Sequence, residues 1–365
     1  MVASINNNCW DCIVVGAGIS GLMAARKLKD AGFKVLVLDK ARGVGGRMAT
    51  RRIESAVFDH GAQFFTARDS QFQEIVNNWI DAGAVKSWFL MKKEEAGDET
   101  MRYIGVKSMT SLPKYLASDI DVQLNSRVIS IKSEEGCWKL HAETGDKIFG
   151  HSLLITTPVP QGLDLLSDVE SDIAQPFLDQ LRKVRYAPCF TLMLMLDGPS
   201  GINAPGFQHS PAPGIACMTD NSLKGISPDA YSVTVHATVD YSTKHFDEEP
   251  DLVAEQMFDA VSHLLDSSVK LWEMQRWNYS KVITWLSEPF LLSESPVPIA
   301  YAGDAFVAPR VEGAALSGNA AGDALVAYLK KKQNDAQPGF LNRFEVTAPH
   351  SSCPVYAPHQ SGFPK

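Results

Sequence analysis

The sequence predicts an α/β protein with two interleaved domains, and three observations support this fold class. A short apolar strand, a glycine-rich turn, a helix and a second apolar strand follow one another within residues 12–39. An apolar strand, a glycine and a helix recur within residues 299–318. The chain has 365 residues, more than one hydrophobic core usually supports, so we expect two cores.

The first strand and its turn have the composition of a nucleotide-binding motif. Residues 12–15 form an apolar run that is too short for a helix, as in a buried parallel strand. Gly16 permits a tight turn, Gly18 lets the backbone approach a pyrophosphate, and Gly21 lets the following helix pack on the sheet. This spacing indicates a phosphate-binding turn.

The helix expected over residues 20–31 and the acid after the second strand extend this motif. The free N–H groups at the start of that helix, together with its dipole, attract phosphate. Asp39 follows Gly21 by 18 residues, close to the offset of a carboxylate that binds a ribose hydroxyl. Together these features predict a Rossmann-like unit that binds a dinucleotide.

Two further segments are suited to the same ligand. Residues 40–48 carry a second glycine cluster with two arginines, which fits a second stretch of backbone folded against the dinucleotide. Near the carboxyl terminus, Gly303 and Asp304 end an apolar strand, and residues 309–318 lead into a helix. Segments near both termini therefore have to converge on one ligand.

These motifs resemble the FAD-dependent amine-oxidase superfamily. The resemblance rests on residues 12–39, 43–47, 59–65 and 303–304, and it covers roughly residues 10–332. Within the superfamily, the runs at 46–52, 61–66 and 303–306 are most similar to the renalase-like branch.

The resemblance implies a two-domain FAD-binding oxidoreductase and a set of FAD-binding residues. It places Gly16 and Gly18 on the pyrophosphate, Asp39 on the adenosine ribose, Arg47 by the phosphates and Asp304 on the ribityl chain. The full set that it implies is Gly16, Gly18, Ile19, Ser20, Gly21, Asp39, Lys40, Gly45, Gly46, Arg47, Met48, Gln63, Phe64, Val128, Thr157, Gly303, Asp304, Glu312, Gly313, Ala314 and Ser317.

The helix that starts near Glu312 should direct its positive dipole end at the pyrimidine end of the flavin and stabilise negative charge there. For Gly313 and Gly318, simple helix packing explains the presence of glycine as well as a contact with FAD does.

The domains are expected to be discontinuous. The FAD domain is predicted over residues 9–66, 107–160 and 297–332, and an α+β substrate domain over 67–106 and 161–296. Residues 335–365 have little apolar periodicity and are expected to form a flexible tail.

The substrate pocket should lie where the second domain covers the flavin ring, because a pocket at a domain junction can exclude water. The candidates for its wall are Phe64, Tyr186, His236, Trp277 and Trp285, with Tyr279 beside them. Each is individually better explained as a core or structural residue. His60 beside Asp59 could form an acid–base pair, but sequence neighbours on a strand point to opposite faces.

Composition excludes several classes of function. A net charge of −8 argues against nucleic acid and anionic membrane surfaces. No apolar run reaches the roughly 18 residues of a membrane span, and no signal peptide is recognisable, so the cytoplasm is expected. Six scattered cysteines suggest no metal site. Cys9 and Cys12 have CxxC spacing, but Cys12 belongs to the buried first strand.

Two absences separate the chain from better-known amine oxidases. No lysine follows Lys183 in the strand at 184–190, and no cysteine lies between Cys217 and Cys353, so FAD should be bound non-covalently.

The renalase-like resemblance implies oxidation of isomeric dihydronicotinamides of NAD(P)H, with hydride passing to flavin and O2 giving H2O2. Two alternatives stay open: a flavin oxidase or dehydrogenase that acts on an amine or a carotenoid-like substrate, and a non-catalytic flavoprotein.

Overall fold

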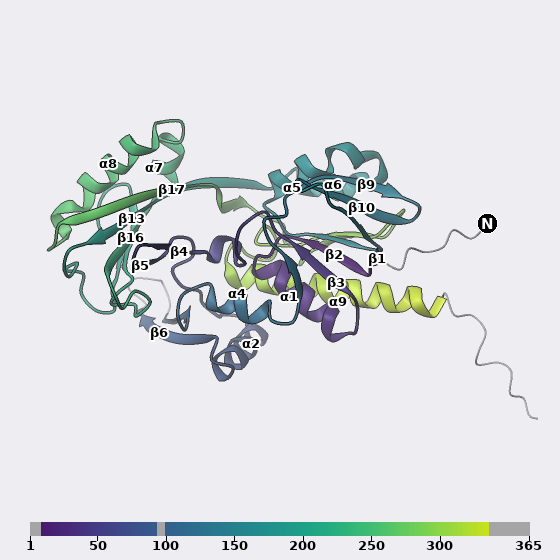
Figure 1. Ribbon diagram of the computed structural model, residues 1–365, viewed down its shortest axis with the longest axis horizontal. Coiled ribbons are helices and arrows are strands. Elements are labelled where there is room, and N and C mark those ends of the chain that lie inside the picture. Colours follow the sequence, from purple (N-terminus) through teal and green to yellow (C-terminus); the bar gives the residue numbers. More distant parts are fainter. Residues whose placement is uncertain (1–8, 93–98, 336–365) are drawn as a thin grey trace, which may run out of the picture. The chain divides into compact units, whose positions relative to one another are not determined.

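The computed structural model describes residues 9–92 and 99–335 (Figure 1). Contacts divide the chain into Met1–Ala327 and Tyr328–Lys365. In the second unit, the structure describes only the end of helix α9 (Val311–Asp335). Most of the tail expected at 335–365 therefore lies outside the described residues. No helix of the described part is long and apolar enough to cross a membrane.

A six-stranded sheet with the order β18-β19-β12-β2-β3-β8 carries the predicted nucleotide-binding turn. Its five strands from β19 to β8 are parallel, and β18 is antiparallel to β19. The strands are Leu291–Ser293, Ile299–Tyr301, Leu153–Ile155, Cys12–Val15, Val35–Leu38 and Asp121–Gln123, in that order across the sheet. The central strands are buried along their whole length, which explains why their sequences are continuous apolar runs.

A four-stranded sheet with the order β1-β11-β10-β9 shares a core with the first sheet. Its strands are Cys9–Trp10, Lys147–Gly150, Cys137–Ala142 and Val128–Glu134. Trp138 is fully buried in this core, and its indole nitrogen donates to the carbonyl of Pro298 at 2.8 Å. Helices α5 (Val159–Leu166) and α6 (Gln175–Leu181) contribute to the same core, with the 3-10 helix η2 (Ser167–Asp172) between them.

Helix α1 (Ile19–Asp30) follows the glycine turn and packs on β2 and β3. Helix α4 (Ser111–Leu116) contacts α1. Helix α9 crosses the start of α1 so closely that a Cβ on Gly318 would lie 2.1 Å from the carbonyl oxygen of Ser20. Gly318 therefore serves the close packing of two helices.

A five-stranded antiparallel sheet with the order β14-β15-β16-β13-β17 forms a separate core with helices α7 and α8, which Figure 1 shows gathered on one side of β13, β16 and β17. The strands are Phe207–His209, Ile215–Asp220, Tyr231–Ala237, Arg185–Leu196 and Val269–Thr284. The helices are α7 (Val239–Lys244) and α8 (Pro250–Val261), followed by the 3-10 helix η3 (Ser262–Leu264).

Two hairpins and one helix complete the described residues. The hairpin of β4 (Thr50–Ile53) and β5 (Ala56–Asp59) follows the 3-10 helix η1 (Gly46–Met48). Helix α2 (Ser70–Asp81) leads into the hairpin of β6 (Val85–Met91) and β7 (Thr100–Gly105).

The predicted elements agree with these bounds at the most regular positions. The strand expected at 12–15 has the observed limits, and the helix expected over residues 20–31 is observed as α1 one residue earlier, at Ile19–Asp30. The mixed α/β fold class is confirmed. The division into an FAD domain and a substrate domain stays a prediction.

Replacing Gly318 by alanine tests the contact between α9 and α1. Alanine favours the helix, so any loss of stability would report the clash with Ser20. We expect the free energy of unfolding to fall by about 1–3 kcal/mol in urea titrations of the variant. Gly43→Ala is the matched control, because nothing lies within 4 Å of the position that its Cβ would take. Equal effects of the two changes would contradict this packing account.

Candidate active site

The carboxyl ends of β2, β12 and β19 meet at a junction of backbone. Gly16 has a φ of +114°, and a Cβ there would lie 2.6 Å from Oγ1 of Thr156. Thr156 Oγ1 donates to the Gly16 carbonyl at 3.1 Å, and the Gly16 amide donates to Leu38 at 2.8 Å. The junction therefore requires glycine at position 16.

The second glycine cluster lies against the first. Gly45 forms a parallel bridge with Gly18, and its amide donates to the carbonyl of Ala17 at 2.8 Å. Gly45 and Gly46 both have positive φ. A Cβ added to Gly18 would meet nothing within 4 Å, whereas a Cβ on Gly21 would meet the Gly16 carbonyl at 2.0 Å. Gly18 thus leaves an open approach to the backbone.

The first turn of α1 holds a polar atom that suits a phosphate. Ser20 is 4% exposed, and its Oγ has no hydrogen-bond partner among the described residues. Gly18 occupies the N-cap position and supplies no side-chain cap, so the first amides of the helix are not capped by it. Ile19, which follows Gly18, and Met48, which follows Arg47, are both buried. A buried hydroxyl beside uncapped amides fits an anionic oxygen.

Asp39 binds the glycine turn from the end of β3. Its Oδ2 accepts the amide of Ala17 at 2.7 Å, and its Oδ1 accepts the amide of Ala41 at 2.8 Å. The Ser126 amide donates to the Asp39 carbonyl at 2.8 Å, which brings the start of β9 at Val128 near this position. Each carboxylate oxygen retains a second lone pair, so the ribose contact implied by the resemblance stays available.

Lys40 is exposed, and its Nζ donates to Oε1 of Gln161 at 3.2 Å.

Arg47 and Asp304 form a two-pronged ion pair across 257 residues of sequence. The two N···O distances are 2.5 and 2.7 Å. The Tyr186 hydroxyl donates to the same carboxylate at 3.3 Å, and the Arg47 guanidinium lies 5.7 Å from the Tyr186 ring centroid. Burial lowers the pKa of Arg47, but Asp304 and Tyr186 together outweigh burial, and the net pKa is raised. The sequence motifs predicted that both side chains contact one ligand, but they did not indicate that the two bind each other.

The start of α9 is fixed by two buried side chains. Ser317 Oγ accepts the Gly303 amide at 3.0 Å. Glu312 is 3% exposed, and its Oε1 accepts the amides of Arg68 and Asp69 at 2.6 and 2.7 Å. These contacts join the last strand, the last helix and the loop before α2.

The neighbouring positions serve packing. A Cβ on Gly313 would lie 2.0 Å from the carbonyl of Ala308, and Ala314 is buried. The Tyr301 hydroxyl donates to the Thr157 carbonyl at 2.9 Å, so Thr157 is held at the end of β12.

Gln63 lies in the turn after β5 and has a free acceptor. Its Nε2 donates to the carbonyls of Asp59 and Gly61. Its Oε1 is buried without a hydrogen-bond partner among the described residues. A buried amide oxygen without a partner is costly, so it marks a position where a ligand donor would be favoured.

Phe64 belongs to an aromatic cluster with Trp88, Phe89 and Phe207. Its ring centroid lies 6.3, 6.4 and 5.3 Å from theirs, respectively. The guanidinium of Arg102 lies 5.0 Å from the Phe64 centroid. The cluster joins the turn after β5 to strands β6 and β14.

A buried ion pair, Asp59–Lys224, was not predicted. Both side chains are fully buried, and Nζ lies 2.7 Å from Oδ2. Asp59 Oδ1 accepts the Thr50 hydroxyl at 2.6 Å and the Met109 amide at 3.0 Å. Burial lowers the pKa of Lys224, and Asp59 opposes that shift. The lysine also lies 5.3 Å from the Trp88 ring centroid. This buried lysine belongs to the segment after β15. Strand β13, which the sequence analysis noted for its lack of lysine, supplies none.

His60 and His236 are both bound in a neutral cluster. The carbonyl of His60 accepts the Trp277 indole N–H at 3.0 Å and His236 Nε2 at 3.3 Å. The His60 and Trp277 rings stack at 5.2 Å. Burial lowers the pKa of each histidine to about 4, so neither carries charge at neutral pH. His60 and Asp59 have different side-chain partners and form no acid–base pair in this structure.

The remaining aromatic candidates, Tyr279 and Trp285, lie in different surroundings. Tyr279 packs edge-on against Tyr186 at 5.8 Å, beside the Arg47–Asp304 pair. Trp285 is 49% exposed, just past the end of β17, and joins none of the described ring contacts. Of the five predicted wall residues, Tyr186 adjoins the ion pair, His236 and Trp277 adjoin His60, and Phe64 adjoins Trp88.

Comparisons with known proteins agree with this architecture. A family model described as flavin containing amine oxidoreductase matches residues 81–326, and one described as NAD(P)-binding Rossmann-like domain matches residues 14–79. Mouse (Mus musculus) renalase is 26% identical over 297 residues, which cover 76% of this chain and 86% of renalase.

Two solved structures share the fold. A putative protoporphyrinogen oxidase from Exiguobacterium sp. 255-15 has a TM-score of 0.63 at 13% identity, covering 87% of this chain and 98% of that one. Wild-type putrescine oxidase bound to putrescine has a TM-score of 0.61 at 13% identity, covering 87% and 99%. The family model confirms the amine-oxidase superfamily that the motifs indicated, and the similarity to renalase agrees with the renalase-like branch.

Removing the charge of Asp59 tests the buried ion pair. Asp59→Asn leaves the Lys224 ammonium buried without its counter-ion, and we expect a loss of about 3–5 kcal/mol in the free energy of unfolding. The double variant Asp59→Asn/Lys224→Met removes both charges and should regain a large part of that loss. Urea titrations of all three proteins measure it. A loss below about 1 kcal/mol in the single variant would contradict the account.

The neutral state of His60 has a consequence for acid stability. Its pKa is about 4 when folded and about 6.5 in an unfolded chain, so protons bind first to the unfolded state as pH falls. Stability is therefore lost as pH drops below about 6.5. His60→Phe keeps the ring stack and the backbone carbonyl. We expect it to reduce the difference in unfolding free energy between pH 7.5 and 5 by about 2 kcal/mol. An unchanged difference would mean that His60 titrates normally.

Proposed function

The chain belongs to the flavin-containing amine oxidoreductase family, and from that premise we propose that it is an FAD-dependent oxidase of isomeric dihydronicotinamides. Its substrates would be NAD(P)H forms reduced at ring carbons 2 or 6, and O2 would be the electron acceptor. The observation that carries the proposal is the similarity to renalase over 76% of the chain, together with both glycine clusters and the Gly303–Asp304 turn in the sequence.

Several features support FAD as the resident cofactor. The pyrophosphate would lie on the open backbone at Gly18 and on the buried Ser20 hydroxyl. The adenosine ribose would bind Asp39, and the ribityl chain would bind at Gly303 and Asp304. When bound, FAD supplies a two-electron acceptor for hydride. No cysteine lies between Cys217 and Cys353, which supports non-covalent attachment.

Two of the buried polar atoms without hydrogen-bond partners support this assignment. Ser20 Oγ and Gln63 Oε1 each lack a hydrogen-bond partner among the described residues, at opposite ends of the run of predicted FAD contacts along residues 16–64. A hydroxyl can donate to a phosphate oxygen, and an amide oxygen can accept an N–H group of a flavin ring. One extended ligand would satisfy both atoms.

The chemistry of the substrate fits the neutral groups beside Gln63. Loss of hydride from a dihydronicotinamide gives an aromatic pyridinium, so no base has to remove a proton. The balanced reaction is dihydronicotinamide plus O2 plus one proton, giving NAD(P)+ and H2O2. His60 and His236 have lowered pKa values, and His236 Nε2 already donates to a backbone carbonyl. These histidines position neighbours and would take no part in proton transfer.

The aromatic side chains would then do the positioning. Hydride transfer gains most of its rate when the donor carbon is held about 3–3.5 Å from its acceptor in the correct plane. Trp277 is held by its hydrogen bond to His60, and Tyr186 by its bond to Asp304. Rings fixed in this way lose little entropy when a flat substrate stacks on them.

An amine oxidase is the second candidate. The family itself favours it, and so does the perpendicular Tyr186–Tyr279 pair, whose ring faces could contact an alkyl ammonium group. The two candidates differ in the donor that reduces the flavin.

Anaerobic reduction distinguishes them. The purified yellow protein is mixed with the 2-, 4- and 6-dihydro isomers of NAD(P), and separately with monoamines and putrescine, while the oxidised flavin absorbance is followed. We expect rapid bleaching by the 2- or 6-isomer, slow or no bleaching by the 4-isomer, and H2O2 after admission of O2. Bleaching by an amine alone would overturn the proposal in favour of the second candidate.

The assignment of Asp39 has its own test. Asp39→Asn keeps an acceptor for the Ala17 amide but removes the charge, and we expect the Kd for FAD to rise by at least tenfold, about 1.4 kcal/mol. Flavin fluorescence quenching during titration of apoprotein measures it. Asp121→Asn, exposed on β8, is the control. Unchanged FAD affinity in the Asp39 variant would exclude the ribose role.

A further inference from the structure

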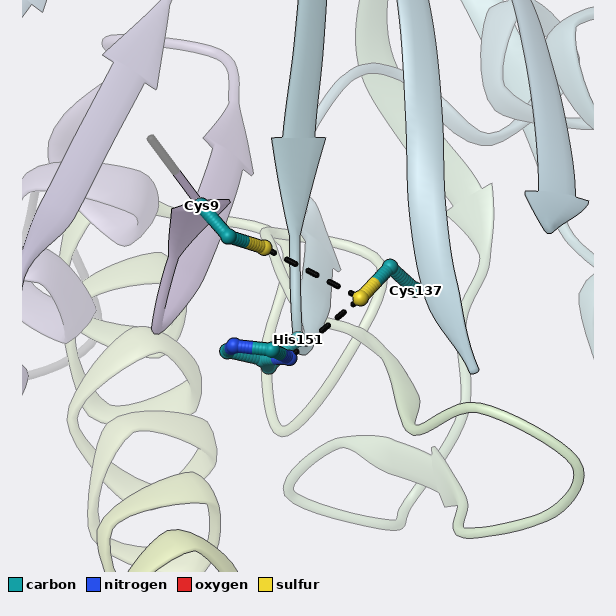
Figure 2. Close-up of side chains that lie close together, drawn as sticks. All are labelled: Cys9, Cys137 and His151. Carbon is teal, nitrogen blue, oxygen red and sulfur yellow. Dashed lines mark hydrogen bonds between the residues drawn. The ribbon is translucent and has the colours of Figure 1, made fainter. Parts of the chain in front are cut away.

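Three side chains that could bind a soft metal ion meet outside the proposed flavin site. Cys9 lies on β1, Cys137 begins β10, and His151 directly follows β11. The two sulfur atoms are 3.9 Å apart, and Cys137 Sγ lies 3.4 Å from His151 Nδ1. The ligand atoms of all three lie within 4.8 Å of one another, and Figure 2 shows them pointing toward a common centre.

Strand register explains why these residues meet. β1 is parallel to β11, with Cys9 opposite Phe149. β10 is antiparallel to β11, with Trp138 opposite Gly150, so Cys137 and His151 are the next residues at the same end. Three neighbouring strands of one sheet therefore each deliver one ligand.

The CxxC spacing in the sequence pointed to a different pair. Cys12 is fully buried on β2, and its Sγ faces the carbonyl of Ile13 at 3.7 Å. Cys9 is half-buried and turns toward Cys137 instead. The partners of Cys9 are 128 and 142 residues away in sequence, so only the fold reveals them.

Two of the three distances between ligand atoms match the edges of a tetrahedral zinc site, and the third is within 4.8 Å. Zn–S bonds of about 2.3 Å and Zn–N bonds of about 2.0–2.1 Å place two sulfurs about 3.8 Å apart, and a sulfur about 3.5 Å from a nitrogen. The observed separations are 3.9 and 3.4 Å. A disulfide would require a sulfur separation of about 2.05 Å. We propose that Cys9, Cys137 and His151 bind a Zn²⁺ ion, with water as the fourth ligand.

The chemistry of the donors favours this class of cation. Two thiolates neutralise a divalent ion, and the combination of thiolate and imidazole selects Zn²⁺ over Mg²⁺ or Ca²⁺, which prefer oxygen. All three side chains are half-buried, so the ion can enter from solvent and retain a water. The site is distinct from the flavin residues, because none of its ligands belongs to the glycine clusters or to α9.

The ion would act as a clamp on the first strand. β1 has two residues and pairs only with β11 among the described strands. One residue, Asp11, separates β1 from β2, which leads into the turn at Gly16. A metal that joins β1 to β10 and β11 would therefore fix the chain just before the nucleotide-binding turn.

Metal titration of the FAD-loaded protein tests the site. Protein purified with a non-thiol reductant and stripped with a chelator is titrated with Zn²⁺ by calorimetry. We expect one ion per chain and a rise in Tm. Cys9→Ser, Cys137→Ser and His151→Ala should each weaken binding at least tenfold. Cys189→Ser, which changes a half-buried cysteine on β13, should bind as the parent does.

Cobalt provides a readout that does not depend on the variants. Co²⁺ bound by the parent protein should show the intense visible bands of a tetrahedral ion to the red of the flavin absorbance. Thiolate-to-metal charge transfer should appear in the near ultraviolet, in the difference spectrum against the metal-free protein. Absence of stoichiometric Zn²⁺ uptake would overturn the proposal, as would a cobalt spectrum without thiolate bands. Formation of a Cys9–Cys137 disulfide by protein that takes up no metal would also overturn it and identify a redox pair.

Discussion

The rest of the structure depends on one constraint. The ends of strands β2, β12 and β19 approach one another so closely that the turn after β2 has no room for a side chain at Gly16. β2, β12 and β19 are parallel neighbours, and ligands of such sheets bind beyond their carboxyl ends. The turn after β2 touches Thr156, which closes β12, so a Cβ at Gly16 has no space. Because these strands end near residues 15, 155 and 301, the chain must leave this junction and return to it twice.

Those excursions supply the groups that face the candidate site. The hairpin of β4 and β5 carries Asp59 and ends at the Gln63 turn, and β13 and β17 bring Tyr186 and Trp277. Two ion pairs then connect distant parts of the chain: Arg47 with Asp304, and Asp59 with Lys224. In each pair, the two opposite charges neutralise each other inside the protein. His60 and His236 are neutral, so the region offers aromatic surface and fixed dipoles instead of free acids and bases.

The local part of this arrangement could be predicted from the sequence. The strand at Cys12–Val15, the glycine turn and the acid at position 39 are all encoded within 28 residues, so pattern and spacing suffice. The packing explanation for Gly313 and Gly318 was also available, and the contacts with Ala308 and Ser20 support it for both.

Contacts between distant residues could not be predicted in this way. Lys224 looks like any surface lysine until the fold buries it against an acid 165 residues earlier. The Cys9 cluster depends on the register of β1, β11 and β10, which no local pattern specifies. The exposure of Trp285 could not be predicted either. Aromatic character alone does not distinguish an exposed ring past the end of β17 from a buried one.

The most direct measurement of the central claim is a crystal structure of the protein with FAD bound. The account predicts the pyrophosphate at Gly18 and Ser20, the adenosine ribose at Asp39, the ribityl chain at Gly303 and Asp304, and the flavin ring next to Gln63. FAD bound away from the carboxyl ends of β2, β12 and β19, or Ser20 Oγ and Gln63 Oε1 still without partners in the complex, would contradict it.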